Sequence, residues 1–161
     1  MGLKKVNIKD WRDLAPLEGW AKVIKVYDGD TFWLALSPTE PTNLELLSLD
    51  QPDKLRLVNV RLARVNAPEL RGAESDKGKA SKQYVESLIA DQIVWFKFGN
   101  FGLYHGESLD RYQRQIGEIY FVPSNNHHAS QGSGLSLVGG GYGYNLSDHL
   151  LESGHAVPFT V

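Results

Sequence analysis

Two short segments of the chain carry oxygen-bearing side chains that could hold a hard divalent cation. They are residues 28–30, which read Asp-Gly-Asp, and residues 66–69, which read Asn-Ala-Pro-Glu. Such cations prefer carboxylate, amide and carbonyl oxygens as ligands. A turn that presents Asp30 and a strand end that presents Asn66 and Glu69 can meet at one place. The alternative is a plain turn at 28–30, and the spacing does not fit the ligand loop of an EF-hand.

Two arginines are candidates for binding an anion. A guanidinium group is permanently charged and presents paired N–H groups that fit phosphate oxygens. Arg61 lies in the same predicted strand as Asn66, and Arg114 comes at the approach to a strand much later in the chain. These two residues could therefore clamp a phosphate group. The alternative for each is an ordinary surface charge or a salt bridge.

Aromatic and histidine residues give weaker signals. Most aromatic side chains fall in apolar runs and are expected in the core or in a barrel wall. Tyr104 and Tyr112 fall in predicted loops, where either could stack on a base. The histidines show no spacing typical of a zinc site; they are His105, His127, His128, His149 and His155.

The composition excludes several kinds of site. The 161-residue chain contains no cysteine, which rules out a disulfide framework, a thiolate zinc site and a cysteine nucleophile. A net charge of -2 and a pI of about 6.2 do not indicate a strongly basic nucleic-acid-binding protein. The charge is uneven, however, because five basic residues and one acid lie from Lys54 to Arg71, next to an acidic segment at 40–53. This basic stripe is either a binding surface or a solvated face.

Nothing in the sequence indicates a membrane protein. No apolar stretch approaches the length needed to cross a bilayer. The first residues lack the apolar run of a signal peptide, and Val6 stands where a myristoylation motif has Ser or Thr. We therefore expect a cytoplasmic protein that does not act at a membrane.

The apolar pattern predicts a mainly β protein with two helices. Strands are predicted at 20–27, 31–36, 55–65, 93–98 and 115–122, and helices at 74–90 and 145–153. The Asp-Gly pair at 28–29 predicts a tight hairpin turn. A shift of the alternation near Val58 predicts a bulge or bend. The first helix is predicted to bury one apolar face, formed by Ala80, Tyr84, Val85, Leu88 and Ile89.

This order of elements predicts an OB-fold, an α+β architecture. A five-stranded barrel has one helix between its third and fourth strands, and here a short C-terminal helix follows. We expect residues 1–18 to be an irregular leader and residues 19–161 to form a single domain. The segment 123–144 is rich in Gly, Ser, Asn and His and is expected to be a flexible insertion.

The chain resembles the staphylococcal nuclease (thermonuclease) family in four segments. They are 21–36 (AKVIKVYDGDTFWLAL), 60–69 (VRLARVNAPE), 110–120 (DRYQRQIGEIY) and 145–159 (NLSDHLLESGHAVPF). Each motif is short, but all four occur in the family's order. The resemblance implies a calcium-dependent endonuclease that hydrolyses phosphodiester bonds of DNA and RNA with little sequence preference, single strands being favoured.

The resemblance also implies a calcium site. Asp30 would be a direct ligand, Asn66 would provide a second ligand, and the backbone carbonyl of Ala67 a third. Asp28 and Thr31 would orient these ligands through hydrogen bonds. The family has an aspartate at the position of Asn66, so the site loses one unit of negative charge and is expected to bind calcium more weakly.

Four further residues match positions that act on the substrate in the family. Glu69 would assist the attacking water as a general base or by positioning it. Arg61 and Arg114 would clamp the phosphate and stabilise the charge that grows in the transition state. Tyr112 matches a tyrosine that contacts a nucleotide phosphate. A metal-dependent nuclease is therefore the leading hypothesis.

Two other functions remain open at this point. A noncatalytic OB-fold module could bind single-stranded nucleic acid, with the basic stripe at 54–71 as its surface. A protein-interaction or inhibitor domain could present the segment 123–144 to a partner. Replacing Glu69 by Gln distinguishes these functions, because a nuclease would lose its cleavage activity whereas a binding module would be almost unaffected.

Overall fold

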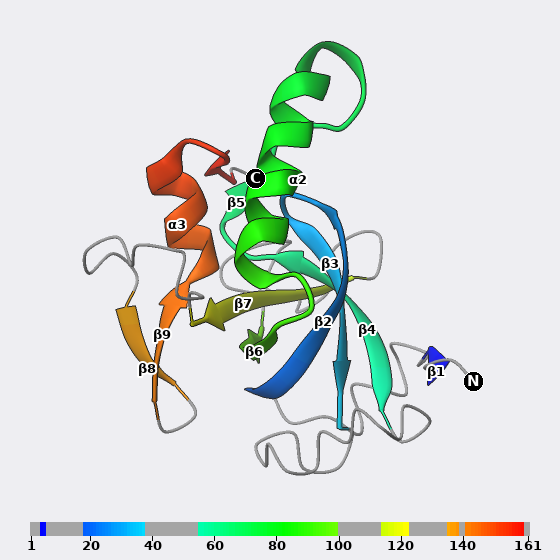
Figure 1. Ribbon diagram of the computed structural model, residues 1–161, viewed down its shortest axis with the longest axis vertical. Coiled ribbons are helices and arrows are strands. Elements are labelled where there is room, and N and C mark those ends of the chain that lie inside the picture. The colour runs from blue at the N-terminus through cyan, green and yellow to red at the C-terminus, as the bar shows by residue number, and fades with distance from the viewer. Residues whose placement is uncertain are drawn as a thin grey trace.

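Five strands close into a barrel in the computed structural model, which describes residues 4–5, 18–37, 55–99, 114–122, 135–138 and 141–159 (Figure 1). The barrel strands are β2 (Glu18–Asp28), β3 (Thr31–Leu36), β4 (Arg56–Leu62), β6 (Ile93–Phe98) and β7 (Gln115–Phe121). Neighbouring strands pair in the order β4-β3-β2-β6-β7, and a parallel pairing of β4 with β7 closes the ring. The order and the closure are those of an OB-fold, as predicted.

Alternation of side chains along the strands builds the core. Residues that point into the barrel are apolar and fully buried, among them Phe32, Leu34, Val60, Phe96 and Ile119. Because successive side chains in a strand point to opposite faces, the residues between them lie on the outer surface. The outer surface of β3 and β4 includes Thr31, Trp33, Asn59 and Arg61.

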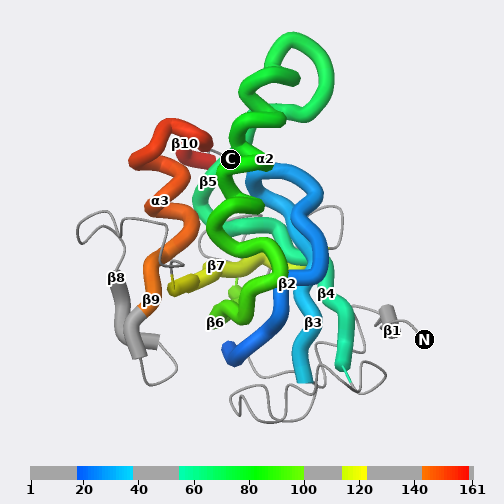
Figure 2. Tube along the Cα trace, in the orientation of Figure 1, coloured from blue at the N-terminus to red at the C-terminus, as the bar shows by residue number. Residues whose placement is uncertain are grey.

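Two helices and several short strands complete the fold. Helix α2 (Ser75–Ile89) follows the short helix η3 (Gly72–Glu74) and packs against β2, and α3 (Leu146–Ser153) packs beside β7. Strands β8 (Leu135–Val138) and β9 (Gly141–Asn145) form a hairpin that pairs with β7. Strand β1 (Lys4–Lys5) lies parallel to β4. Figure 2 shows β5 (Val65–Asn66) beside β10 (Val157–Pro158), its antiparallel partner near the C-terminus.

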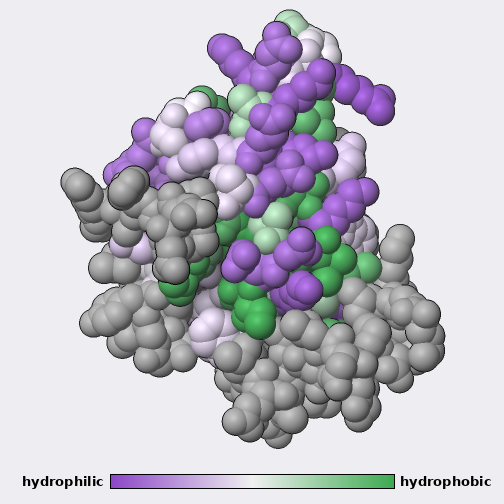
Figure 3. Space-filling model, in the orientation of Figure 1, coloured by the Kyte–Doolittle hydropathy of each residue, from purple (hydrophilic) through white to green (hydrophobic). Residues whose placement is uncertain are grey.

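The predicted helices are confirmed, and the predicted face of α2 is buried except at Ala80, with Tyr84 partly buried against the core. The side chains of Val85, Leu88 and Ile89 are buried as predicted, whereas Ala80 is exposed and the small residues Gly78 and Ser81 are buried in its place. Hydrophilic side chains cover the outward face of α2 (Figure 3). Helix α3 is capped at both ends: Asn145 Oδ1 accepts a hydrogen bond from Asp148 N, and Gly154 adopts a left-handed φ of 77°.

Three other predictions need correction. The bulge near Val58 is wrong, since β3 and β4 pair without a register shift from Thr31↔Arg61 to Leu36↔Arg56. The chain bends later, at Ala63-Arg64, where Arg64 has a φ of 69°. The loop predicted at 123–144 is wrong for 135–138 and 141–144, which belong to β8 and β9. Lys4–Lys5 is a strand inside the leader predicted to be irregular, and the other leader residues up to 17, with 38–54, lie outside the described residues.

The helices of the described residues give no candidate membrane span, because none of them is both long enough and apolar enough to cross a bilayer.

Candidate functional site

The turn between β2 and β3 directs Asp30 into the end of the barrel. Asp28 Oδ1 accepts a hydrogen bond from Asp30 N at 3.0 Å, which fixes the turn. The carboxylate of Asp30 then accepts two hydrogen bonds, from Thr31 Oγ1 at 3.0 Å and from Ala67 N at 2.8 Å. Asp30 is only 6% exposed. The bond to Ala67 joins the two oxygen-bearing segments of the sequence, which therefore meet as predicted.

Arg61 is a fixed cation at the floor of this cluster. Its side chain leaves β4 and donates from Nη1 to the carbonyl oxygens of Leu62 and Val65, at 2.7 and 2.8 Å. Its Nη2 donates to Asn66 Oδ1 at 3.2 Å and lies 3.5 Å from Asp30 Oδ2. Arg61 is 4% exposed. The bend between β4 and β5 thus holds this guanidinium in one orientation, beside the buried carboxylate that balances its charge.

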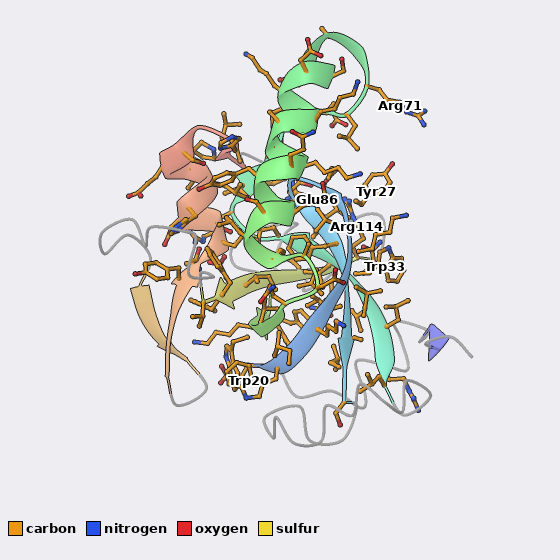
Figure 4. The ribbon with its side chains drawn as sticks, in the orientation of Figure 1. Trp20, Tyr27, Trp33, Arg71, Glu86 and Arg114 are labelled. Atoms are coloured by element: carbon orange, nitrogen blue, oxygen red, sulfur yellow. The ribbon has the colours of Figure 1, made fainter. Side chains whose placement is uncertain are left out.

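Arg114 reaches the same cluster from the residue before β7. Its Nη1 donates to Thr31 Oγ1 at 3.0 Å, and Thr31 Oγ1 donates in turn to Asp30. Figure 4 shows Arg114 beside β3, on the edge of the barrel that also carries Tyr27 and Trp33. The two arginines predicted to bind phosphate therefore both reach the Asp30 cluster, Arg61 directly and Arg114 through Thr31, although they are far apart in the sequence.

The ionisation of Asp28 depends on its surroundings. Burial, and next the negative charge of Asp30, raise the pKa of Asp28 from 3.8 to about 7. The hydrogen bond from Asp30 N and the positive charge of Arg61 act in the opposite direction. At neutral pH Asp28 is therefore only about half ionised, and the cluster carries less negative charge than its sequence suggests.

Asn66 joins the cluster through the hydrogen bond that its Oδ1 accepts from Arg61, and Glu69 follows three residues later in the chain. Both side chains are exposed, and between them Ala67 is buried at 7% exposure. The carboxylate of Glu69 faces solvent, where a water molecule can reach it. Tyr112, predicted to contact a phosphate, lies in 100–113, outside the described residues.

Helix α2 supports the site through two small residues that the sequence analysis missed. A Cβ on Gly78 would lie 2.1 Å from Glu69 O, so the helix backbone directly contacts the segment that carries Glu69. A Cβ on Gly29 would lie 2.1 Å from Ser81 Oγ and 2.8 Å from the Cβ of Ala67. The turn, the Ala67 segment and the helix are thus packed in van der Waals contact. In the sequence, the small residues Gly78 and Ser81, three apart in the predicted helix, were the available sign that this face of the helix is closely packed.

An ion network that was also missed holds the bend before Asn66. Arg64 binds Glu118 of β7, and its Nη2 donates to Asn145 Oδ1 at 3.0 Å and to Asp148 Oδ1 at 3.1 Å. These charges raise the pKa of Arg64 against the opposing effect of its partial burial. Ser147 Oγ donates to Ala63 O at 2.7 Å. The start of α3 is therefore fastened to the bend that leads into Asn66 and Ala67.

The basic stripe predicted at 54–71 is not one surface among the described residues. Arg61 is buried, and Arg64 is committed to Glu118 and Asp148. Arg56 is half-buried and donates to Leu55 O, and Arg71 is exposed. A noncatalytic binding module that relies on this stripe thus loses much of its support.

The oxygen donors of the site suit a hard cation such as Ca²⁺. A carboxylate has about four acceptor positions, and Asp30 uses two of them for hydrogen bonds within the protein. Asn66 Oδ1 accepts one bond, from Arg61, and an amide oxygen can accept a second. Within the described ranges, however, no group of three or more His, Cys, Asp or Glu side chains could hold a metal. The donors fit calcium in kind, while the low charge predicts weak binding.

Comparison with known proteins gives no further guidance, because neither a scan of protein-family models nor a search of curated proteins finds a match. The arrangement itself combines a buried carboxylate, a fixed cation, a second cation at the barrel edge and an exposed carboxylate. Such a combination can bind an anionic diester and place a water molecule beside a carboxylate that accepts its proton.

Proposed function

We propose that the chain is a calcium-dependent nuclease that hydrolyses phosphodiester bonds of DNA and RNA. The observation that carries this proposal is the hydrogen-bonded series from Arg114 through Thr31 to Asp30, with Arg61 Nη2 at 3.5 Å from the same carboxylate. These contacts support the proposal because they join Asp30, Thr31, Arg61 and Arg114, the residues to which the resemblance to staphylococcal nuclease assigns roles. A purely structural salt bridge would need only one of the two arginines.

Arg114 would bind the phosphate, and Arg61, whose Nη groups already donate within the protein, would stabilise the developing charge as a fixed positive charge. Arg61 is held by main-chain carbonyls, so little reorganisation accompanies its action. Arg114 is positioned by Thr31. Removal of one such donor from a preorganised site costs about 10²–10³ in rate. Both cations therefore act where a phosphodiester gains negative charge, on its nonbridging oxygens.

Glu69 accepts a proton from the attacking water. The water oxygen forms a bond to phosphorus, one ester P–O bond breaks, and the leaving oxygen takes up a proton. A positioned general base contributes about 10²–10⁴ in rate. The contact between Gly78 and the Glu69 backbone holds the segment in place while the side chain stays exposed to water.

The residues that would hold calcium are Asp30 and Asn66, together with the carbonyl of Ala67. The bound ion would supply positive charge that polarises a phosphoryl oxygen. Asp28 and Thr31 orient Asp30 through the bonds already described. One carboxylate and one amide make this a weak site, so we expect activity at millimolar rather than micromolar calcium.

Cleavage of a fluorescent single-stranded DNA, with calcium or with chelator, tests the proposal. Glu69→Gln and Arg114→Ala should each lose at least about 10²-fold in kcat while remaining folded. Glu152→Gln and Arg56→Ala change the same residue types outside the site and should retain full activity. Folded protein that does not cut in calcium would overturn the proposal. Tight binding without cutting would instead support the noncatalytic single-strand module.

A further inference from the structure

Two aromatic side chains lie on the barrel surface next to the site. Tyr27 directly precedes Asp28 and is 53% exposed, which is high for so large a side chain. Trp33 follows Thr31 by two residues on β3 and is half-buried. Figure 4 shows Tyr27, Arg114 and Trp33 along one edge of the barrel. None of the steps derived above uses either aromatic residue.

Strand register explains why both rings face outward. Val26 and Phe32 are paired and buried inside the barrel, so their neighbours Tyr27 and Trp33 point to the opposite face. A register irregularity between Val26 and Asp28 makes Tyr27 an extra residue in β2. A bulge of this kind re-aims a side chain and occurs often beside functional sites.

Charge on this face is complementary to a nucleic-acid backbone. Lys25 is exposed and pairs with Trp33 across the strands, and Arg114 is bonded to Thr31. In OB-folds, the face of the second and third strands and the loop between the first and second strands bind oligonucleotides. Here those elements are β3, β4 and the turn at 28–30, so the aromatic pair occupies this face.

We propose that Tyr27 and Trp33 form a stacking subsite for an unpaired base next to the phosphate bound by Arg114. This inference rests on the proposed function for the identity of that phosphate, and it adds a base-binding subsite that would account for the single-strand preference implied by the resemblance. A base inside a duplex is stacked on its neighbours and cannot lie against these rings. The subsite therefore makes the protein select single-stranded DNA or RNA over duplex.

Binding in the presence of chelator tests the subsite without turnover. Fluorescence anisotropy compares a labelled oligothymidylate with a duplex of the same length. Tyr27→Leu should weaken single-strand binding by about 5- to 150-fold, the range given by 1–3 kcal/mol per stacked base. Duplex binding should not change, and Tyr27→Phe, which keeps the ring, should bind like the parent protein. The same comparison applies to Trp33: Trp33→Leu should weaken single-strand binding, and Trp33→Phe, which keeps a ring, should bind like the parent protein.

A matched control comes from the other end of β2. Trp20 is half-buried and packs edge-to-face on Trp95, with their ring centroids 4.9 Å apart. Figure 4 shows Trp20 well away from Tyr27. Trp20→Leu should leave single-strand affinity unchanged. A series of oligonucleotides, each with an abasic site at a different position, should show weakened binding at one position only. In Tyr27→Leu, the abasic site at that position should cause no further loss, because the base and the ring are coupled partners.

The outcomes separate this inference from the proposed function. If folded Tyr27→Leu and Trp33→Leu bind the single strand like the parent protein, the subsite is refuted, while calcium-dependent cutting would still stand. Equal weakening of single-strand and duplex binding would also overturn base stacking. If the coupled loss is found but no cutting occurs in calcium, the subsite is supported and the nuclease proposal fails.

Discussion

Replacement of Gly78 by alanine tests whether α2 holds Glu69 in place. Helix propensity alone favours the change, since alanine in a helix interior is more stable than glycine by about 0.5–1 kcal/mol. The new Cβ, however, would lie 2.1 Å from Glu69 O and 2.6 Å from Glu69 C. Both atoms belong to the backbone and cannot rotate away. The helix and the Glu69 segment must therefore separate.

The size of the effect follows from these distances. Real Cβ atoms essentially never approach another heavy atom closer than 3.0 Å, so the separation must be roughly 1 Å. Overpacking of this kind costs about 1–3 kcal/mol, which exceeds the gain in propensity. We expect Gly78→Ala to lower the free energy of unfolding by about 1–2 kcal/mol. A 1 Å misplacement of a catalytic group can cost about 10²-fold in rate, so kcat should fall by about that factor.

Urea unfolding and single-strand cleavage in calcium measure the two effects separately. Ala80→Gly is the matched control, because Ala80 is exposed on the same helix. It should lose about 1 kcal/mol of stability through propensity alone and keep its kcat. A Gly78→Ala protein that is more stable than the parent and equally active would refute the reasoning, because it would show that the helix does not fix the Glu69 segment.

Three further changes have defined outcomes. Asn66→Asp should tighten calcium binding by about tenfold or more, because unit charges about 4 Å apart interact by on the order of 1–4 kcal/mol; an unchanged Kd in calorimetry would exclude residue 66 as a ligand. The pKa of Asp28 is raised from 3.8 to about 7 by folding, so its stabilising contribution is complete below the lower value and is lost as pH rises through the upper one. The Tm of chelator-treated protein should thus fall between about pH 4 and pH 7, and Asp28→Asn should flatten this dependence. Ser81 Oγ is buried without a hydrogen-bond partner among the described residues, so Ser81→Ala should raise the free energy of unfolding by up to about 1–3 kcal/mol, and a decrease would contradict this.

Local signals were sufficient for most of the fold. Alternation places β3 at Thr31–Leu36 and β6 at Ile93–Phe98, with the bounds that the structure shows. The Asp-Gly turn and the caps of α3 depend on neighbouring residues only, and they could be read from the sequence. The irregular register of β2 against β3 and the hairpin of β8 and β9 were not predicted. The glycine-rich composition of 132–143 obscured the strands there, and β9 also pairs with β7, which is distant in the sequence.

The same division applies to the site. Residue types singled out Asp30, Arg61 and Arg114 as candidates, and the resemblance to staphylococcal nuclease placed them in one site. These signals did not show that Arg61 is buried and bound to carbonyl oxygens of its own bend. They also could not show the partners of Arg64, which lie 54 to 84 residues further along the chain. Contacts of this kind depend on the closed barrel, and no local pattern encodes them.

The fastening of the Asn66 segment to the C-terminal part of the fold has a consequence for synthesis on the ribosome. Strand β5 has β10 as its partner, with Asn66 opposite Val157, and Arg64 is bound to the start of α3. A nascent chain that lacks residues 145–159 contains every proposed catalytic side chain but not the contacts that fix this segment. Contacts between such distant residues form late in folding. The proposed nuclease would therefore become competent only after residues 145–159 have been synthesised, and RNA near the ribosome would be spared until then.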